Sequence, residues 1–311
     1  MTEIGKIITG VAQGEARAIG RAISMVENHA ASAPALVEAL DGQRIAACLV
    51  LGITGPPGAG KSTLTARLIQ EYRRRGRRIG IVAVDPSSPL SGGALLGDRV
   101  RMMTHTLDPD VVIRSMASRG RLGGVCGAAG AAVRIMAHSG CTVVLIETVG
   151  VGQSEMDVVG MADLTAMVLA PGLGDDIQAM KAGLLEVADL LVVNKADLRG
   201  ADRLILDMES VARQRQDKQG RAVPVCATVA DQGQGVAALV DHFHRLHREI
   251  EASGAKERHR RRARRAEVAD WAMELLRPRI IEAVAARSTL DGDALVLARQ
   301  ILTEMGLAPR K

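Results

Sequence analysis

Residues 48–63 read CLVLGITGPPGAGKST, and this stretch decides the fold. Its first part, 48–54, is an apolar run of strand length, and its second part, 55–62, fits the P-loop pattern GxxxxGK[ST]. Helical sequence follows from Thr63. In such a unit the glycines let backbone N–H groups turn toward phosphate oxygens, and the helix N-terminus adds its positive end. The stretch therefore predicts a phosphate-binding loop.

Downstream of this loop, short apolar runs alternate with stretches of helix length. The predicted strands are 48–54, 79–84, 142–146, 164–169, 190–193 and 223–227. Continuous apolar strands separated by helices are typical of a parallel sheet that is covered on both faces. We therefore predict an α/β fold of the P-loop NTPase class, with a doubly wound, mostly parallel sheet.

Helical patterns flank this core at both ends. Between residues 14 and 41 we predict two amphipathic helices, with Ile19, Ile23 and Val26 on one face. After about residue 250 the pattern is helical to the end. We therefore expect an N-terminal helical extension at 1–45, a P-loop domain at 46–250 and a C-terminal helical arm at 251–311.

The P-loop supplies the first candidate site residues. Lys61 has the reach to contact the β and γ phosphates, which makes it a candidate catalytic cation, and the Ser62 hydroxyl is a ligand for Mg²⁺. The expected nucleotide contacts of this segment are Gly55, Pro57, Gly58, Ala59, Gly60, Lys61, Ser62 and Thr63.

The sequence NKAD at 194–197 directly follows the predicted strand 190–193. A carboxylate at Asp197 can accept hydrogen bonds from N1–H and the 2-amino group of guanine. Adenine has no 2-amino group and carries an acceptor at N1. On a late strand of a P-loop domain, Asn194, Lys195 and Asp197 therefore predict selection of guanine, with GTP or GDP as the bound nucleotide.

A third motif, ETVG at 147–150, directly follows the predicted strand 142–146. A P-loop enzyme needs an acidic residue here for the Mg²⁺ shell and a glycine whose N–H senses the γ-phosphate, and Glu147 and Gly150 fit these roles. Gln153 follows in a segment expected near the γ-phosphate. Asp85 and Asp98 are further candidate carboxylates on the magnesium side.

Six segments carry a resemblance to a known family. They are GITGPPGAGKST at 52–63, VDPSSPLSGGALLGDRVRM at 84–102, RGRLGGV at 119–125, IETVGVGQSE at 146–155, PGLGDDIQAMKAG at 171–183 and NKAD at 194–197. In this order they resemble the MeaB/ArgK family, the methylmalonyl-CoA mutase-associated GTPases, over roughly residues 15–285.

This resemblance implies a homodimeric GTPase with a P-loop core and a C-terminal dimerisation arm. It also implies that the protein binds an adenosylcobalamin-dependent acyl-CoA mutase, gates the delivery of intact cofactor and protects the mutase. Because the chain has no cobalamin-binding DxHxxG motif and no mutase barrel, the mutase would be a separate protein.

The resemblance also assigns residues by their match to family motifs. Ser62, Asp85, Asp98 and Glu147 match the magnesium-side positions. Asp175, Gln178 and Lys181 match a switch loop that communicates with the mutase. Ala227 and Thr228 stand at positions that contact the base in relatives.

Two other functions are open on the sequence alone. A metal-insertion GTPase of the nickel type usually shows His-rich tracts or a CxC or CxxC cluster, whereas the 7 His of this chain are dispersed. A nucleic-acid-associated P-loop ATPase is suggested by the basic run KERHRRRARR at 256–265. Aromatic residues, which form the usual stacking platforms for single strands, are only 1% of the chain. We therefore expect a solvated helical face and no nucleic-acid partner.

The remaining composition indicates the compartment. None of the 4 Cys forms a CxxC pair, and no secretory leader is visible. The longest apolar stretches fall far short of the roughly 18 residues that suggest a membrane span. We expect a cytoplasmic protein with no membrane partner.

Overall fold

The computed structural model of the chain describes residues 2–85, 107–117, 126–148, 154–173, 182–220, 223–287 and 289–307. The chain forms two compact units, Met1–Ala263 and Arg264–Lys311. Within the described residues, no helix is both long and apolar enough to cross a membrane.

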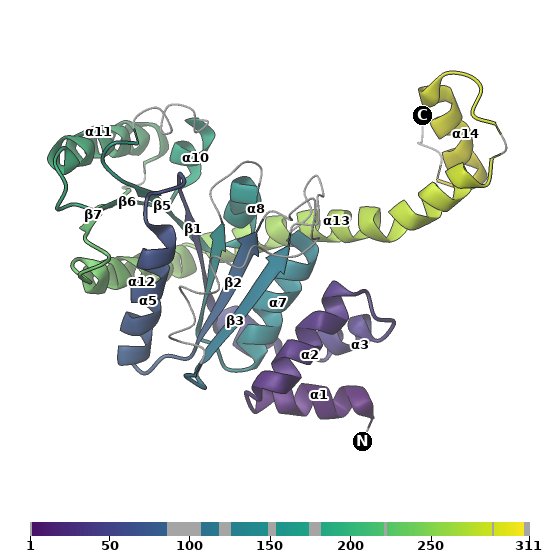
Figure 1. The fold of residues 1–311 in the computed structure, drawn as a ribbon, viewed down its shortest axis with the longest axis horizontal. Coiled ribbons are helices and arrows are strands. Elements are labelled where there is room, and N and C mark those ends of the chain that lie inside the picture. The colour runs from purple at the N-terminus through teal and green to yellow at the C-terminus, as the bar shows by residue number, and fades with distance from the viewer. Residues whose placement is uncertain are drawn as a thin grey trace. The chain divides into compact units, whose positions relative to one another are not determined.

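A seven-stranded sheet forms the centre of the first unit (Figure 1). The strands are β1 (Leu49–Thr54), β2 (Ile79–Asp85), β3 (Val111–Ala117), β4 (Val143–Thr148), β5 (Leu164–Leu169), β6 (Leu190–Asn194) and β7 (Val225–Thr228). All neighbours pair in parallel, in the order β3-β2-β4-β1-β5-β6-β7. The predicted α/β fold is thus confirmed, and β1 lies in the middle of the sheet.

Six of the strands agree with the prediction to within two residues at each end, but β3 was missed. Its sequence, VVIRSMA, carries Arg114 and Ser115 and therefore lacks the continuous apolar run of a buried strand. The strand lies at the end of the sheet order, where Arg114 forms an ion pair with Glu27 of the helix beside it. A polar side chain is tolerated because this edge position has a charged partner.

Helices cover both faces of the sheet, which explains why β1, β4, β5 and β6 are buried at every residue. One face packs against α5 (Lys61–Arg74) and α12 (Val236–Ala252), and the other against α7 (Cys126–His138) and α8 (Ser154–Met161). Helices α10 (Ala182–Val187) and α11 (Ala201–Gln219) pack against the β5–β7 side.

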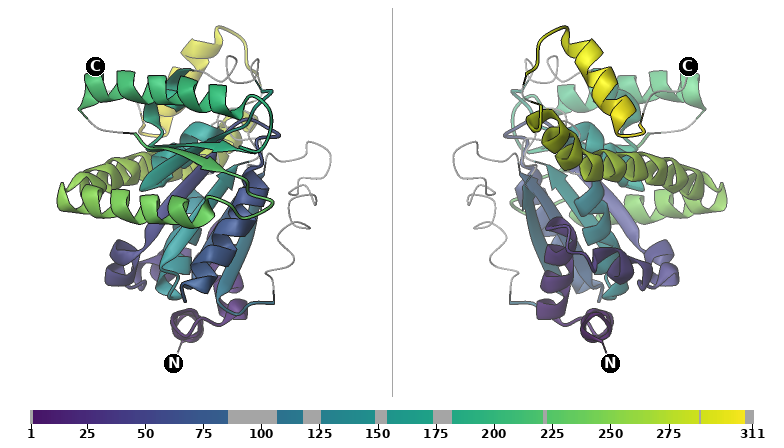
Figure 2. Two further views of the ribbon diagram at one scale, coloured as in Figure 1. Left: turned by 90° about the vertical axis from the view of Figure 1, so that its left-hand side faces the viewer. Right: turned by 90° about the vertical axis from the view of Figure 1, so that its right-hand side faces the viewer.

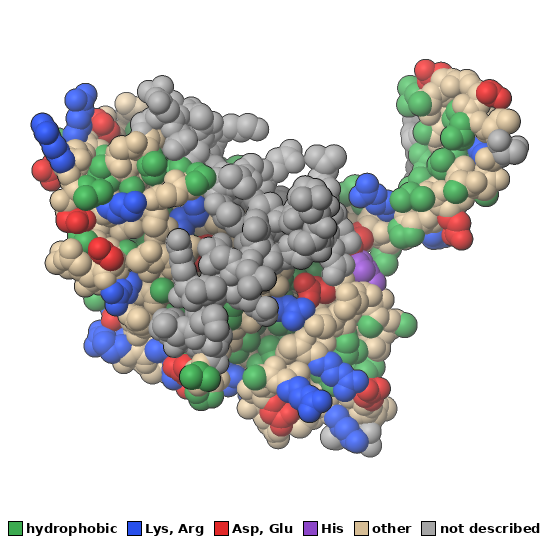
Figure 3. Space-filling view, viewed as in Figure 1, with side chains coloured by type: hydrophobic (Ala, Val, Ile, Leu, Met, Phe, Trp, Pro, Cys, Tyr) green, Lys and Arg blue, Asp and Glu red, His purple; other side chains and the backbone are tan. Residues whose placement is uncertain are grey.

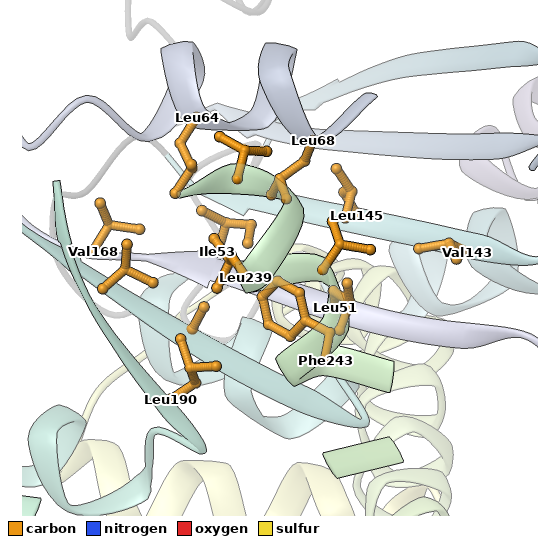
Figure 4. Packing of buried hydrophobic residues seen from close by; sticks show 14 of the residues in the cluster. Leu51, Ile53, Leu64, Leu68, Val143, Leu145, Val168, Leu190, Leu239 and Phe243 are labelled. Carbon is orange, nitrogen blue, oxygen red and sulfur yellow. The ribbon is translucent and has the colours of Figure 1, made fainter. Parts of the chain in front are cut away.

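The largest part of the core lies between the sheet and the α5 and α12 layer (Figure 4). Leu51 and Ile53 of β1 meet Leu64 of α5 and Phe243 of α12, and all four side chains are fully buried. Each such side chain stabilises the fold by roughly 1.5–3 kcal/mol. This packing fixes α5, which begins at the P-loop, against the strand that precedes the loop.

The N-terminal helices form an outer layer on α7 (Figures 1 and 2). They are α1 (Glu3–Ala12), α2 (Ala16–Glu27), α3 (Ala33–Glu38) and α4 (Gly42–Ala47). The two helices predicted between residues 14 and 41 correspond to α2 and α3, and Ile19, Ile23 and Val26 are buried as expected. Helix α1 was not predicted separately, and its first turn is capped by the Thr2 hydroxyl, which accepts from the N–H of Gly5 at 3.2 Å.

The C-terminal part consists of α13 (Ala255–Ala285) and α14 (Ala294–Glu304), and the basic run lies on α13. Most of the run is exposed, as expected for a solvated face: Glu257, Arg258, Arg261, Arg262, Arg264 and Arg265. Lys256 is the exception that corrects this expectation, because it is only 6% exposed. Its ammonium donates to the carbonyl of Ala46 at 3.0 Å and to Glu251 at 2.8 Å. The guanidinium of Arg260 donates to both carboxylate oxygens of Asp163 at 2.6 Å.

The ion pair of Arg260 with Asp163 attaches the first turns of α13 to the amino ends of β1 and β5. The Asp163 side chain is 1% exposed and also accepts from the N–H of Val50 at 2.9 Å. Arg260 in addition donates to the carbonyl of Cys48 at 2.7 Å. Charge alone did not reveal these roles, because the residues in contact lie about a hundred positions or more away along the chain.

Replacing Arg260 by Met should destabilise the protein by about 2–4 kcal/mol, because the Asp163 carboxylate would remain buried without its cation. Urea denaturation of the full chain measures the change. The matched control is Arg261→Met, since Arg261 is 66% exposed and its pair with Glu257 is worth less than about 1 kcal/mol. Equal destabilisation by the two substitutions would contradict a specific role for Arg260.

Candidate functional site

The loop at 55–60 leaves the carboxyl end of β1 in a shape that requires glycine. Gly55, Gly58 and Gly60 all have positive φ, at 139°, 79° and 89°. A Cβ on Gly55 would lie 2.0 Å from the carbonyl oxygen of Val168 on β5, and a Cβ on Gly60 would lie 2.4 Å from the Asn194 amide nitrogen. A side chain at any of the three positions would therefore be strained, and one at Gly55 or Gly60 would also collide with a residue of a neighbouring strand.

Lys61 begins α5 directly after this loop, and it is 7% exposed. Its ammonium donates to the carbonyls of Gly55 at 2.7 Å and Pro56 at 3.1 Å, so the charge lies within the turn of the loop. A fixed cation and the positive end of a helix thus occupy one position. Together they can stabilise the negative charge of a phosphate group.

Ser62 and Glu147 meet beside the loop. The Ser62 hydroxyl donates to a carboxylate oxygen of Glu147 at 2.6 Å, and Glu147 is 5% exposed. In the sheet register Glu147 pairs with Ile53 of β1 and with Ala83 of β2. Both side chains offer oxygen atoms, which Mg²⁺ prefers as ligands, and the two residues therefore fit a magnesium site. Asp85 is the last residue of β2, two positions beyond Ala83.

Asn194 connects three loops at this edge of the sheet, and it is 2% exposed. Its amide nitrogen donates to the carbonyl of Ala59 in the P-loop at 2.9 Å. Its amide oxygen accepts from the Thr228 hydroxyl and from the N–H of Ala230, both at 3.1 Å. The end of β6, the P-loop and the turn after β7 are therefore held together by one side chain.

Lys195 and Asp197 follow in the same turn. Lys195 has a positive φ of 57°, and its ammonium donates to the carbonyl of Gly58 at 2.8 Å. Asp197 is exposed, so its carboxylate is accessible to the donor edge of a base. The structure thus brings NKAD and GPPGAGKS, more than 130 residues apart, into direct contact.

The other predicted residues divide into two groups. Pro57 and Thr63 lie in the P-loop and in the first turn of α5, and Ala227 is an exposed residue of β7 next to the buried Thr228. The other predicted positions lie outside the described residues: Asp98, Gly150, Gln153, Asp175, Gln178 and Lys181.

Sequence reasoning missed two participants in the site. Ala230 contributes its backbone N–H to Asn194, and Arg67 of α5 donates to the carbonyl of Ala230 at 2.9 Å. A backbone contact has no residue-type signature, and Arg67 lies six positions after Lys61 with no motif around it.

Comparison with known proteins gives a consistent picture. The family model of the methylmalonyl-CoA mutase-associated GTPase MeaB matches residues 16–289. A protein of Pyrococcus horikoshii that is named as a GTPase is 46% identical over 260 residues, which cover 82% of this chain and 81% of that protein. The mouse mitochondrial methylmalonic aciduria type A homolog is 30% identical over 319 residues, covering 96% of this chain and 75% of that protein.

One solved structure supports the fold. A crystal structure of an LAO/AO transport system kinase superposes with a TM-score of 0.64, at 23% sequence identity, and the match covers 98% of this chain and 99% of that chain. At this level of identity the likeness concerns the fold alone. The α/β fold of this chain is therefore shared with a protein of known structure.

Substituting Gly60 by Ala should weaken GDP binding by at least about ten-fold, because the new Cβ would displace the Asn194 amide from Ala59. Isothermal titration calorimetry with GDP and Mg²⁺ measures the affinity. Gly76→Ala is the matched control, since Gly76 also has positive φ, 71°, but has no atom within 4 Å of the added Cβ. Unchanged GDP affinity in Gly60→Ala would show that GDP binding does not depend on the contact between Asn194 and Ala59.

Proposed function

The chain belongs to the family of methylmalonyl-CoA mutase-associated GTPases, MeaB, and from this premise we propose that it is a GTP-dependent chaperone of an adenosylcobalamin-dependent acyl-CoA mutase. In this proposal the protein gates the delivery of intact cofactor to a separate mutase, methylmalonyl-CoA mutase or a close relative, and protects that enzyme. The chain itself is a nucleotide-binding GTPase, which hydrolyses GTP to GDP and phosphate.

The observation that carries this proposal is the extent of the family match. It runs over residues 16–289 and so includes helices on both sides of the nucleotide core. A match to the P-loop alone would support only nucleotide binding. The mouse relative, whose name refers to methylmalonic aciduria, covers 96% of this chain. Both findings support a role in methylmalonyl-CoA metabolism beyond hydrolysis.

The residues of the site support the following division of roles. Lys61 would stabilise charge on the transferring phosphate, and backbone N–H groups of the P-loop would hold the other phosphate oxygens. Gly150 would sense the γ-phosphate, and Gln153 would orient the attacking water. Asn194 would hold the loops in register, while Asp197 would accept from the guanine edge.

We further propose Mg²⁺ as the metal of this site, held by Ser62, Asp85, Asp98 and Glu147. The oxygen atoms of the Ser62 and Glu147 side chains, 2.6 Å apart, fit such a hard cation. When bound, Mg²⁺ would neutralise charge on the β and γ phosphates. Asp85 and Asp98 would complete the carboxylate side of the shell.

The segment that follows β5 is proposed as the switch toward the mutase, with Asp175, Gln178 and Lys181 as its communicating residues. Strand β5 pairs with β1, so the segment starts next to the strand that leads into the P-loop. Gly172, at the start of the segment, has a positive φ of 84°. Ordering of such a loop by nucleotide is a known mode of signalling in GTPases.

In a turnover assay, the cognate mutase should stimulate GTP hydrolysis by the wild-type chain, and Lys181→Ala should reduce that stimulation while intrinsic turnover changes by less than about two-fold. Released phosphate is measured with and without the mutase. Lys6→Ala is the control, because Lys6 is an exposed lysine on α1 outside the sheet. A wild-type chain that neither binds nor responds to the mutase would contradict the chaperone role. Loss of intrinsic turnover in Lys181→Ala would make the loop catalytic instead.

The alternative function is metal insertion by a GTPase of the nickel type. Such a protein must hold its metal ion at a cluster of His, Cys, Asp or Glu side chains. Over the described ranges of this chain, no group of three or more such side chains is placed to hold a metal ion. What favours the mutase partner over this alternative is the match of the mutase-associated family model to residues 16–289.

We also propose a homodimer through the C-terminal helical arm. Several large apolar side chains of the second unit are exposed, among them Met273 at 62%, Leu275 at 62% and Leu295 at 69%. Figure 3 shows apolar side chains on the surface of this unit. Exposed apolar side chains gathered in one unit are typical of a surface that a partner covers.

Truncation after Ala263 should convert the dimer to a monomer in multi-angle light scattering, because it removes the second unit and keeps the Arg260–Asp163 pair. Retaining this pair separates loss of the interface from loss of the fold, which circular dichroism monitors. A truncated chain that is still dimeric would exclude the arm as the interface.

The cytoplasm is the proposed compartment. Three cysteines of the described residues, Cys48, Cys141 and Cys226, are buried free thiols, as is usual in a reducing environment. We also propose that the chain has three functional parts: the helical extension 1–45, the GTPase domain 46–250 and the arm 251–311.

A further inference from the structure

We infer that Arg67 is a positioning residue for the guanine base: it fixes the turn after β7 to the P-loop helix and thereby sets guanine-nucleotide affinity. This inference deepens the proposed guanine selection by Asp197 and rests on it. It concerns a residue of α5 that belongs to none of the nucleotide-binding motifs in the sequence.

Arg67 makes its contacts through all three nitrogens of the guanidinium. Nε donates to the carbonyl of Ala230 at 2.9 Å, and Nη2 donates to the carbonyl of Asp231. Nη1 donates to the side chain of Gln70, one turn further along α5, at 3.0 Å. The planar guanidinium can reach two neighbouring carbonyls at once, which a single ammonium group cannot do with the same geometry.

The peptide groups of Ala230 are held from two sides. The N–H of Ala230 donates to the Asn194 amide oxygen at 3.1 Å, while the Ala230 carbonyl accepts from Arg67. This segment continues into a turn with positive φ at Gly233 and Gly235, and its described backbone contacts are mostly local. The bonds to Arg67 and Asn194 therefore determine where Thr228 and Ala230 lie relative to the nucleotide site.

These hydrogen bonds close a ring through the site. From Arg67 the ring passes to Ala230, then to Asn194, and from the Asn194 amide nitrogen to the carbonyl of Ala59. Ala59 is joined through Gly60 to Lys61, where α5 begins, and α5 leads back to Arg67. The segment that would read the base and the loop that would bind the phosphates thus share one rigid frame.

The frame has a specific consequence for binding. Without Arg67, the turn after β7 keeps its hydrogen bonds to Asn194 and Ala196 and the packing of Ala230, but it loses its hydrogen bonds to α5. Its position is then less fixed, and guanine must restrict it on binding. That ordering lowers affinity for a ligand that uses the loop. The affinity of a ligand that contacts only the phosphate-binding part should be unchanged. Loss of Arg67 should therefore weaken guanine nucleotides selectively.

The experiment compares full-length wild type with Arg67→Met, Arg67→Lys and Arg74→Met. Arg74 is the matched control, because it is on the same helix, is 69% exposed and pairs only locally with Glu71. Its replacement removes the same charge without touching the turn after β7. Calorimetry with GDP and with ADP, both with Mg²⁺, gives the affinities, and steady-state turnover gives KM and kcat for GTP.

For Arg67→Met we expect the Kd for GDP to rise by about ten-fold and the Kd for ADP to change by less than about two-fold. KM for GTP should rise in parallel, while kcat should fall by no more than about two-fold, since the phosphate site is intact. Arg67→Lys should lie between wild type and Arg67→Met, and Arg74→Met should match wild type.

Several results would overturn the inference. If wild type prefers GDP over ADP but Arg67→Met binds GDP as wild type does, the inference alone fails. It also fails if Arg67→Met weakens GDP and ADP equally, or if Arg74→Met reproduces its effect. If Arg67→Met does not fold, Arg67→Lys decides, and wild-type GDP affinity in that variant overturns the inference. Equal GDP and ADP affinity in wild type overturns the guanine assignment itself, and the inference with it.

Discussion

The nucleotide edge of this protein depends on one buried side-chain amide. Asn194 uses its nitrogen for the carbonyl of Ala59 and its oxygen for Thr228 and Ala230, so a single planar group fixes the spacing of three loops. Because the amide is 2% exposed, each of these bonds forms away from competing water, and losing one would leave a buried polar atom without its partner. The glycine at position 60 is a consequence of this contact, since any Cβ there would occupy the space of the amide.

The sequence was sufficient for most of the fold because parallel buried strands have a distinctive pattern. Strands such as β1 and β5 are apolar at every position, and burial on both faces requires that pattern. Strand β3 could not be found in the same way, since Arg114 at an edge position pairs with Glu27 of α2, which only the tertiary structure brings near. Helix α1 was not predicted as a separate helix, although Ile4, Ile7, Ile8 and Val11 follow the spacing of one helical face.

The candidate site divides along the same line. Lys61, Ser62, Glu147 and Asn194 belong to motifs in which residue type and spacing are both constrained by chemistry, and the structure brings all four to the carboxyl edge of the sheet. Arg67 donates to a backbone carbonyl, and Ala230 contributes its backbone N–H. Neither contact depends on a sequence motif, so the sequence does not reveal these two residues. Most residues of the basic run are exposed, as its charge suggests. Lys256 and Arg260 differ because they bind carboxylates and carbonyls that the sequence does not identify as their partners.

The buried thiols give this chain internal reporters of local opening. Burial raises the pKa of the Cys48 thiol to about 12 and that of Cys226 to about 11, so at neutral pH almost none of either is the reactive thiolate. Cys48 precedes the strand that enters the P-loop, and Cys226 lies on β7, two residues before Thr228. Alkylating reagents can therefore modify each thiol only in molecules whose structure has opened around it. The labelling rates of the two sites would therefore report local opening at the start of the central strand β1 and on the edge strand β7 separately, without any introduced probe.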